Sequence, residues 1–158
     1  MTESASKASP IAYFYCARST AEPERAKPVE VLKALLRQLA SSKPDLPIRE
    51  AVATEYQARK EQAEEDCSKL KQLTISDCTR LILKLIEDRP ATILVDALDE
   101  CEEDSRHELL EALDEIIEKS TEVVKVFVSS RDNIDIVSVL RLSTFSPWPD
   151  QTPSNSES

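Results

Sequence analysis

The chain has 158 residues and a formal net charge of −10, and 41% of its residues are apolar but only 4% aromatic, which suits a single domain with an aliphatic core. Its negative field repels polyanions, which argues against nucleic acid and anionic membrane as partners. The sequence has no glycine, so it cannot contain the G-x-x-x-x-G-K-[ST] or G-x-G-x-x-G loop that holds phosphate in many nucleotide sites.

The N-terminal part of the chain predicts a loose terminus, a strand and a helix. Residues 1–10 are polar, lack the apolar run of a signal peptide and are expected to be disordered. The run Ile11–Cys16 is apolar and aromatic, which favours a buried strand. Pro28 suits the first turn of a helix over 29–40. The apolar face of this helix is formed by leucines at helical spacing, namely Leu32, Leu35, Leu36 and Leu39.

Two further helices are predicted before the next strand. Residues 48–73 are rich in Ala, Glu, Gln, Lys and Arg but have a thin apolar face, which favours an exposed helix with a mobile acidic stretch at 64–66. Thr74 and Asp77 form a T-x-x-D signal for the start of the next helix. That helix should end before Pro90. Its apolar face consists of Cys78, Leu81, Ile82, Leu85 and Ile86.

The C-terminal half predicts two strands, each followed by a helix. Ala91–Val95 is a continuous apolar run, and Val123–Val128 is a β-branched run whose only charge is Lys125; both are typical of buried strands. Between them, Ser105 and Glu108 form a capping box, and the helix behind it carries Leu109, Leu110, Leu113, Ile116 and Ile117. A last helix, capped by Asp132 or Asn133, carries Ile134, Val137 and Leu140. The Ser- and Pro-rich residues 143–158 are expected to be disordered.

Apolar strands that alternate with amphipathic helices predict an α/β fold, in which a parallel sheet of about three strands is covered by helices on both faces. The folded domain should span residues 11–142. No stretch reaches the ~18 apolar residues of a membrane span. Four cysteines and one histidine show no zinc-ligand spacing. We therefore expect free thiols and a reducing, cytoplasmic location; the cysteines are Cys16, Cys67, Cys78 and Cys101.

Acidic side chains follow the strand at 91–95. Asp96 ends this strand, and Asp99 and Glu100 follow within one turn of chain. Ligands of open α/β sheets bind beyond the carboxyl ends of the strands. An aspartate there can bind Mg²⁺, and a nearby glutamate can orient an attacking water. The alternative is that these acids follow a strand only because loops are polar.

The segment Ser129-Ser130-Arg131 follows the last strand directly. An arginine at this position can bind two phosphate oxygens at once, although a solvated loop arginine is the simpler interpretation. Both polar segments should lie at the same edge of the sheet. His107 has no nucleophile as a partner and is expected to be a surface residue.

Several separated motifs resemble one family, the NACHT NTPases of the STAND class in fungi, whose N-terminal region is often described as nephrocystin-3-like. The segment 91–101 resembles their Walker B motif. The segments 12–16, 106–110 and 124–132 are also similar to that family, in the same order. The resemblance implies a partial three-layer P-loop NTPase fold, Mg²⁺ with ATP or GTP as cofactors, and a role in signal transduction.

The resemblance also implies roles for individual residues. Asp96 would coordinate Mg²⁺. Asp99 and Glu100 would form a vestigial catalytic pair, in which Glu100 positions the attacking water. Arg131, with Ser130, would contact phosphate.

The chain departs from the family pattern because the first strand and its glycine-rich, lysine-containing loop do not precede Ile11. We therefore expect a truncated fragment that binds nucleotide very weakly and does not turn it over alone. The missing strand would pair with 123–128, so this edge should recruit a protein partner or a second copy. Two alternatives remain: a half-site NTPase completed by another chain, and a Mg²⁺-dependent phosphohydrolase that uses Asp96, Asp99 and Glu100.

Overall fold

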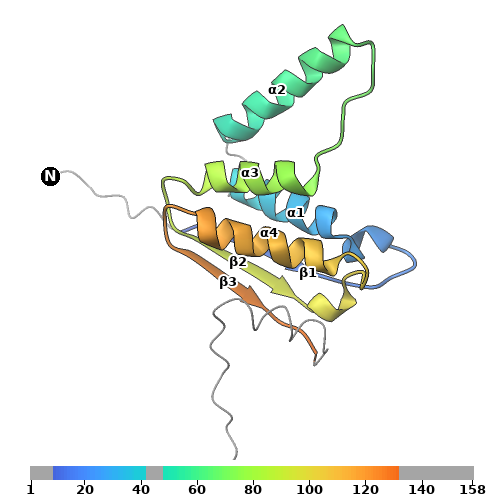
Figure 1. Cartoon of the computed structure of the whole chain (residues 1–158), viewed down its shortest axis with the longest axis vertical. Coiled ribbons are helices and arrows are strands. Elements are labelled where there is room, and N and C mark those ends of the chain that lie inside the picture. Colours follow the sequence, from blue (N-terminus) through green and yellow to red (C-terminus); the bar gives the residue numbers. More distant parts are fainter. Residues whose placement is uncertain (1–8, 42–47, 132–158) are drawn as a thin grey trace, which may run out of the picture.

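A computed structural model describes residues 9–41 and 48–131 of the chain. Three parallel strands form one sheet in the order β1 (Ile11–Tyr15), β2 (Ala91–Asp96) and β3 (Val124–Val128) (Figure 1). The α/β class and the three-stranded parallel sheet predicted from the sequence are therefore confirmed.

Helical elements connect the strands. Between β1 and β2 lie a short 3₁₀ helix and three α-helices: η1 (Pro23–Ala26), α1 (Pro28–Ala40), α2 (Glu50–Glu65) and α3 (Ile75–Leu85). Between β2 and β3 lie η2 (Leu98–Glu100) and α4 (Arg106–Lys119). Each predicted element inside the described ranges is present. The exposed helix expected within 48–73 ends already at Glu65, whereas the bounds of the other elements lie within a few residues of the expected ones. The predicted helix with Ile134, Val137 and Leu140, the tail 143–158 and residues 1–8 lie outside the described residues.

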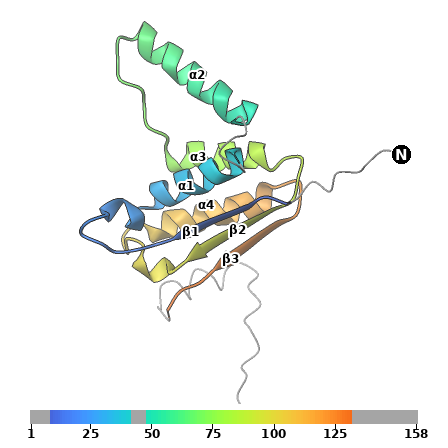
Figure 2. The ribbon, with the colours of Figure 1, turned by 180° about the vertical axis from the view of Figure 1, so that it is seen from behind.

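The helices are stacked in layers above the sheet. Helix α1 packs on β1, α4 packs on β3, and α3 packs on both α1 and α4. Figures 1 and 2 show these three helices on the same side of the sheet from opposite views, with α2 standing beyond α3. The buried core lies between the sheet and these helices; its largest members include Leu32, Leu35, Leu39, Leu81, Ile93, Leu109 and Ile116.

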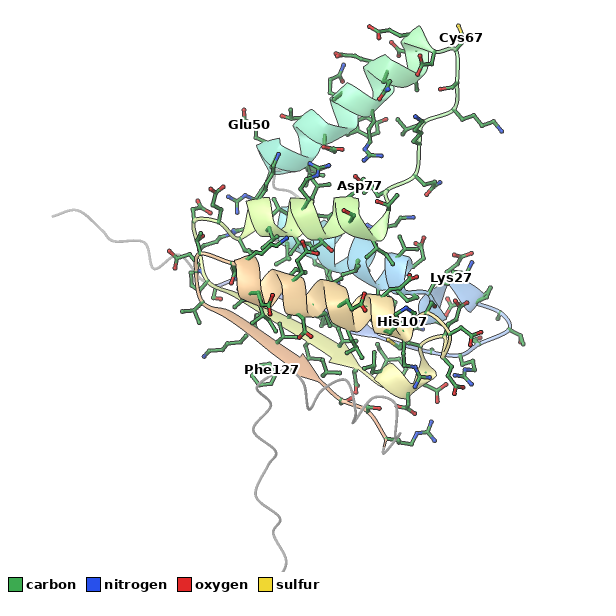
Figure 3. The ribbon with its side chains drawn as sticks, viewed as in Figure 1. Lys27, Glu50, Cys67, Asp77, His107 and Phe127 are labelled. Carbon is green, nitrogen blue, oxygen red and sulfur yellow. The ribbon has the colours of Figure 1, made fainter. Side chains whose placement is uncertain are left out.

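The expectation that helices cover both faces of the sheet is not met by the described residues. Side chains alternate along each strand, so every second one faces away from α1 and α4. Large apolar residues on this second face are 39–65% exposed: Ile11, Tyr13, Tyr15, Leu94 and Phe127. Figure 3 shows Phe127 pointing away from the helices. The apolar runs predict strands buried on both faces of the sheet, but in the structure only the face toward α1 and α4 is buried. A strand's sequence indicates its apolar character and not whether a second layer covers it.

Of the three predicted helix starts that lie within the described residues, two are confirmed. Pro28 occupies the first turn of α1. The Thr74 hydroxyl accepts a hydrogen bond from the Asp77 N–H, and the Asp77 carboxylate accepts one from the Thr74 N–H, which completes a capping box on α3. The Ser105–Glu108 capping box is wrong. Ser105 is the N-cap residue of α4, but its hydroxyl donates to the Glu102 carboxylate at 3.2 Å instead of capping the helix.

Helix α2 has no buried residue, as its thin apolar face predicts. It is held to α3 by ion pairs: Arg59 contacts Asp77 at 2.9 Å, and Arg80 of α3 contacts Glu55 at 3.1 Å. His107 is exposed near the start of α4. Within the described ranges, no helix combines the length and apolar character needed to cross a membrane.

Candidate functional site

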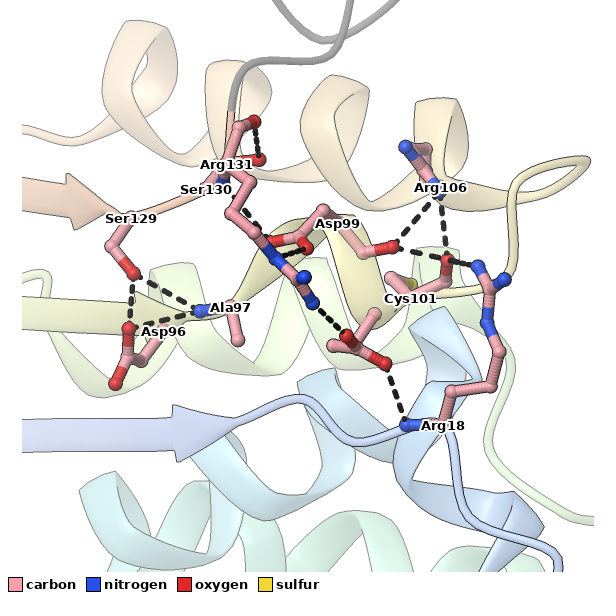
Figure 4. A network of polar contacts seen from close by, with 10 residues as sticks. Arg18, Asp96, Ala97, Asp99, Cys101, Arg106, Ser129, Ser130 and Arg131 are labelled. Carbon is pink, nitrogen blue, oxygen red and sulfur yellow. Dashed lines mark hydrogen bonds and ion pairs between the residues drawn. The ribbon is translucent and has the colours of Figure 1, made fainter.

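The carboxyl ends of β2 and β3 lie side by side. Val95 of β2 pairs with Val128 of β3, so the next residue of each strand, Asp96 or Ser129, emerges at the same edge. The Ser129 hydroxyl donates to Asp96 Oδ1, and the Ala97 N–H donates to Asp96 Oδ1 at 2.9 Å and to Ser129 Oγ at 3.0 Å (Figure 4). The two polar segments therefore meet at one edge, as the sequence predicts.

The residue that follows β2 has a left-handed backbone conformation, which turns the chain away from the strand. Ala97 has φ 55° and ψ 51°, a conformation that glycine adopts without strain and that costs other residues about 1–2 kcal/mol. The turn aims its N–H at the Asp96 carboxylate and starts η2, which carries Asp99 and Glu100. The backbone is thus strained at the point where the acidic segment leaves the sheet.

Both acids of η2 are paired with Arg131. The Arg131 Nε donates to Asp99 Oδ2 at 2.8 Å, and a terminal guanidinium nitrogen donates to Glu100 Oε1. The Arg131 backbone N–H donates to Asp99 Oδ1 at 3.1 Å. This backbone contact, followed by the guanidinium, lowers the pKa of Asp99. The Arg131 side chain is 79% exposed, so it lies over the acids from the solvent side.

Two further arginines contact the same loop. A terminal nitrogen of Arg106 at the start of α4 donates to the carbonyls of Asp99 at 3.3 Å and Cys101 at 3.1 Å. Arg106 is only 3% exposed. Arg18, which follows β1, donates its backbone N–H to Glu100 Oε2 at 3.4 Å and its guanidinium to the Asp99 carbonyl at 3.4 Å. The loop is therefore fixed by cationic groups from three separate segments (Figure 4).

The sequence does not identify Arg18 or Arg106 as parts of this site, and it predicts Ser129 only as a member of the polar segment 129–131, without a role of its own. It selects Ser130, whose hydroxyl donates to the neighbouring Arg131 carbonyl at 2.8 Å, whereas Ser129 contacts Asp96. The parallel register of β2 and β3 would have identified Ser129. Val95 pairs with Val128, so the residue after Val128 must lie beside the residue after Val95. No signal in the sequence identifies Arg18 or Arg106, since their contacts depend on how β1 and α4 pack.

The oxygen ligands at this edge fit a hydrated Mg²⁺ only in part. Asp96 and Ser129 place two oxygens of the kind that Mg²⁺ prefers in direct contact. The carboxylates of Asp99 and Glu100, in contrast, are bound to Arg131. Across residues 9–41 and 48–131, no group of three or more His, Cys, Asp and Glu side chains is placed to hold a metal ion. A triphosphate fits less well, because the sequence has no glycine-rich loop to surround it.

The chain matches the model of a known family. The model of the family described as "Nephrocystin 3, N-terminal" matches residues 1–131, a range that includes all three strands and the whole polar edge. Comparison with the curated proteins gave no match, and comparison with the solved structures gave none either. The matched range is most of the 158 residues. The chain therefore belongs to the nephrocystin 3 N-terminal family.

Proposed function

We propose that this chain forms the acidic-strand and sensor part of a NACHT-type nucleotide switch in signal transduction. On its own it acts as an interaction or regulatory module and does not hydrolyse nucleotide. The observation that carries the proposal is the meeting of Asp96 and Ser129 with the Asp99–Glu100–Arg131 group at one edge of the sheet. Acids that can hold Mg²⁺ and a cation that can contact phosphate are among the recurring parts of phosphoryl-transfer sites.

The same contacts explain why the chain alone is expected to be inactive. The guanidinium that could contact phosphate is bound to both η2 acids, so a phosphate must compete with two carboxylates for it. The backbone N–H groups of a glycine-rich loop, which would provide the main binding energy, cannot form from this sequence. In a complete switch, Mg²⁺ held at Asp96 would supply charge neutralisation for ATP or GTP.

Association with another polypeptide is proposed through the β3 edge. The outer edge of β1 is partly satisfied, because Gln38 of α1 donates to the Tyr13 carbonyl at 2.7 Å and accepts from the Tyr13 N–H at 3.1 Å. In the described part of the chain, β3 pairs only with β2, and Lys125 is its single charge. Exposed edges of this kind recruit further strands.

Calorimetric titration with Mg²⁺–ATP and Mg²⁺–GTP tests the first part of the proposal. We expect no saturable binding at micromolar nucleotide, and phosphate release no faster than in buffer. The matched variants Asp96→Asn and Asp104→Asn each remove one negative charge, but only the first touches the site. Micromolar binding that Asp96→Asn abolishes and Asp104→Asn preserves would show a competent site and refute the proposal. Metal-dependent hydrolysis of a phosphate monoester without nucleotide would favour a phosphohydrolase.

Sedimentation velocity over a wide concentration range tests the second part. We expect concentration-dependent association, weakened by Phe127→Lys on β3. Tyr56→Lys on α2 is the matched control, because both side chains are 56% exposed and both variants add the same charge. A stable monomer at high concentration, or an equal effect of the two variants, would contradict association through β3.

A further inference from the structure

A surface hollow of about 290 Å³ lies between α2 and the returning segment, residues 66–74, which connects α2 to α3. Figure 3 shows Cys67 at the far end of α2 and Asp77 near the start of α3, and the returning segment runs between them. Lys33 of α1 adds a further wall. Four segments of the chain thus surround a concave space, whose size lies just below the about 300–1,000 Å³ of small-molecule pockets. Its lining is mostly apolar and includes Val52, Tyr56, Leu70, Leu73 and Leu81.

The walls of the hollow are held together by contacts within the protein. Arg59 of α2 donates to the Lys71 carbonyl at 3.5 Å, and Lys33 of α1 donates to the side-chain oxygen of Gln72 at 3.1 Å. These bonds connect the returning segment to two helices. Arg59 also pairs with Asp77 of α3 at 2.9 Å, so α2 and α3 are joined beside the same space. The hollow is therefore formed without a ligand, as small-molecule sites usually are.

Part of the apolar lining is in contact with water. Tyr56 is 56% exposed and Leu70 is 43% exposed, whereas Leu81 is fully buried. A ligand that covers Tyr56 and Leu70 is favoured because it removes apolar surface from water. Figures 1 and 2 show α2 beyond α3 and away from the sheet, so the hollow is separate from the polar edge.

The carboxylates at the hollow are already matched by arginines. Glu55 is bound by Arg59 at 2.8 Å and by Arg80 at 3.1 Å. The hydrogen bond from Arg59 is the largest of the causes that lower the pKa of Glu55. Asp77 is bound by the same two arginines, at 2.9 Å and 3.5 Å. Two positive charges thus balance two negative charges, and this network offers no net charge to a ligand.

Two lysines also line the hollow, and only one of them is paired. Lys33 pairs with Glu30 at 2.8 Å. Within residues 9–41 and 48–131, the Lys71 ammonium group has no ion-pair partner. One positive charge is therefore left unmatched at an apolar hollow, in a chain whose net charge is −10. A ligand with a single negative charge complements it.

We propose that this hollow binds a small monocarboxylate with an apolar body, such as a medium-chain fatty acid. The carboxylate pairs with the Lys71 ammonium group, and the apolar body covers Tyr56 and Leu70. The surrounding walls favour a free small molecule over a protein partner, because a stable protein interface needs a broad contact of roughly 800 Å² per partner. Binding at this hollow does not depend on the proposed nucleotide switch.

Fluorescence titration of the full chain with 8-anilino-1-naphthalenesulfonate tests the site, because this probe joins one negative charge to an aromatic body. We expect saturable binding of the probe. Decanoate should displace it, whereas butyrate at the same concentration should not, since butyrate carries the same charge without the apolar body. Absence of saturable binding, or displacement by butyrate as effective as that by decanoate, would overturn the proposal.

Two matched lysine variants test the charge. Lys71→Gln should weaken probe binding roughly two- to fivefold, the range of one exposed ion pair. It should not change the binding of N-phenyl-1-naphthylamine, an uncharged analogue of the probe. Lys69→Gln removes the same charge from a residue that lines a neighbouring hollow but not this one, and it should change neither affinity. Both lysines are exposed, so neither variant disturbs the core. Equal effects of the two variants on probe binding would refute the role of Lys71.

Two apolar variants locate the body of the ligand. Tyr56→Ser and Phe127→Ser each remove an aromatic ring from a side chain that is 56% exposed, but Phe127 lies on the second face of the sheet. Tyr56→Ser should weaken the binding of the probe and of decanoate roughly five- to tenfold, and Phe127→Ser should leave both unchanged. A loss with Phe127→Ser alone, or an equal loss with both variants, would contradict binding at the hollow.

Discussion

Replacing Asp77 with asparagine removes the most strongly held carboxylate between α2 and α3. Its oxygens accept from the Thr74 N–H at 2.9 Å, from the Thr74 hydroxyl at 2.8 Å and from Arg59 at 2.9 Å. The Thr74 N–H is the largest of the causes that lower the pKa of Asp77, and together they lower it from 3.8 to about 2. Asparagine keeps one acceptor and presents an amide group to the other donors, so at least one of these contacts is lost.

The pKa shift sets the magnitude and the pH range of the effect. A shift from 3.8 to about 2 corresponds to roughly 2 kcal/mol at 1.36 kcal/mol per unit, and the loss of a capping box alone costs about 1 kcal/mol. Because the Asp77 side chain is 22% exposed, solvent screens part of this electrostatic stabilisation. We expect Asp77→Asn to lower the free energy of unfolding by about 1–2 kcal/mol near neutral pH. The folded-state pKa lies below the unfolded one, so this stabilisation is present above about pH 4 and is lost as the pH falls through about 2.

Urea denaturation of both proteins between about pH 7 and pH 2.5 measures the effect. The difference in unfolding free energy between the two proteins should be constant near neutral pH and should shrink below about pH 4. Glu61→Gln on α2 removes the same charge from an exposed position and should show a smaller difference at every pH. A gap between Asp77→Asn and the unaltered chain that is equally large at pH 3 and pH 7 would refute the role of the charged carboxylate.

Three other substitutions test the site and the core. Arg131→Ala should raise the affinity for Mg²⁺ in calorimetry at low salt, because it unpairs two carboxylates; Arg37→Ala changes the net charge equally and should not. Ala97→Gly relieves the left-handed strain but gives the unfolded chain more conformational freedom, so the free energy of unfolding in urea should change by less than about 1 kcal/mol. The control Ala58→Gly, inside exposed α2, should lower the free energy of unfolding by about 1 kcal/mol. Leu35→Ala empties a fully buried position and should cost about 2–5 kcal/mol in urea denaturation.

The elements could be predicted because each one has its own local cause. Leu32, Leu35 and Leu39 repeat at helical spacing and are fully buried in α1. The apolar run that ends at Asp96 forms the central strand. The capping box of Thr74 and Asp77 needs only the two side chains and the backbone between them. Such features depend on a few neighbouring residues, so the sequence alone determines them.

The features that could not be predicted depend on residues far apart in the chain. Ser105 follows a cap pattern, but Glu102 offers a competing acceptor once the loop has folded. The contacts of Arg106 require α4 to start directly beneath the η2 loop. The single covered face of the sheet follows from the positions of α1, α3 and α4 together, and a strand's own sequence carries no information on how many layers pack against it. Tertiary packing decides each of these cases.

The absence of glycine affects the acidic edge in two ways. It rules out a flexible main-chain cradle for phosphate, so binding must rely on side chains. It also means that an alanine, not a glycine, adopts the left-handed conformation at the turn after Asp96. That turn is held by the contacts of the Ala97 N–H to Asp96 and Ser129, so the strain is balanced by hydrogen bonds that use the same side chains a metal ion would need. Mg²⁺ bound at Asp96, as we propose, would compete with the fold for these oxygens, and its binding would have to rearrange contacts that already hold the turn in place.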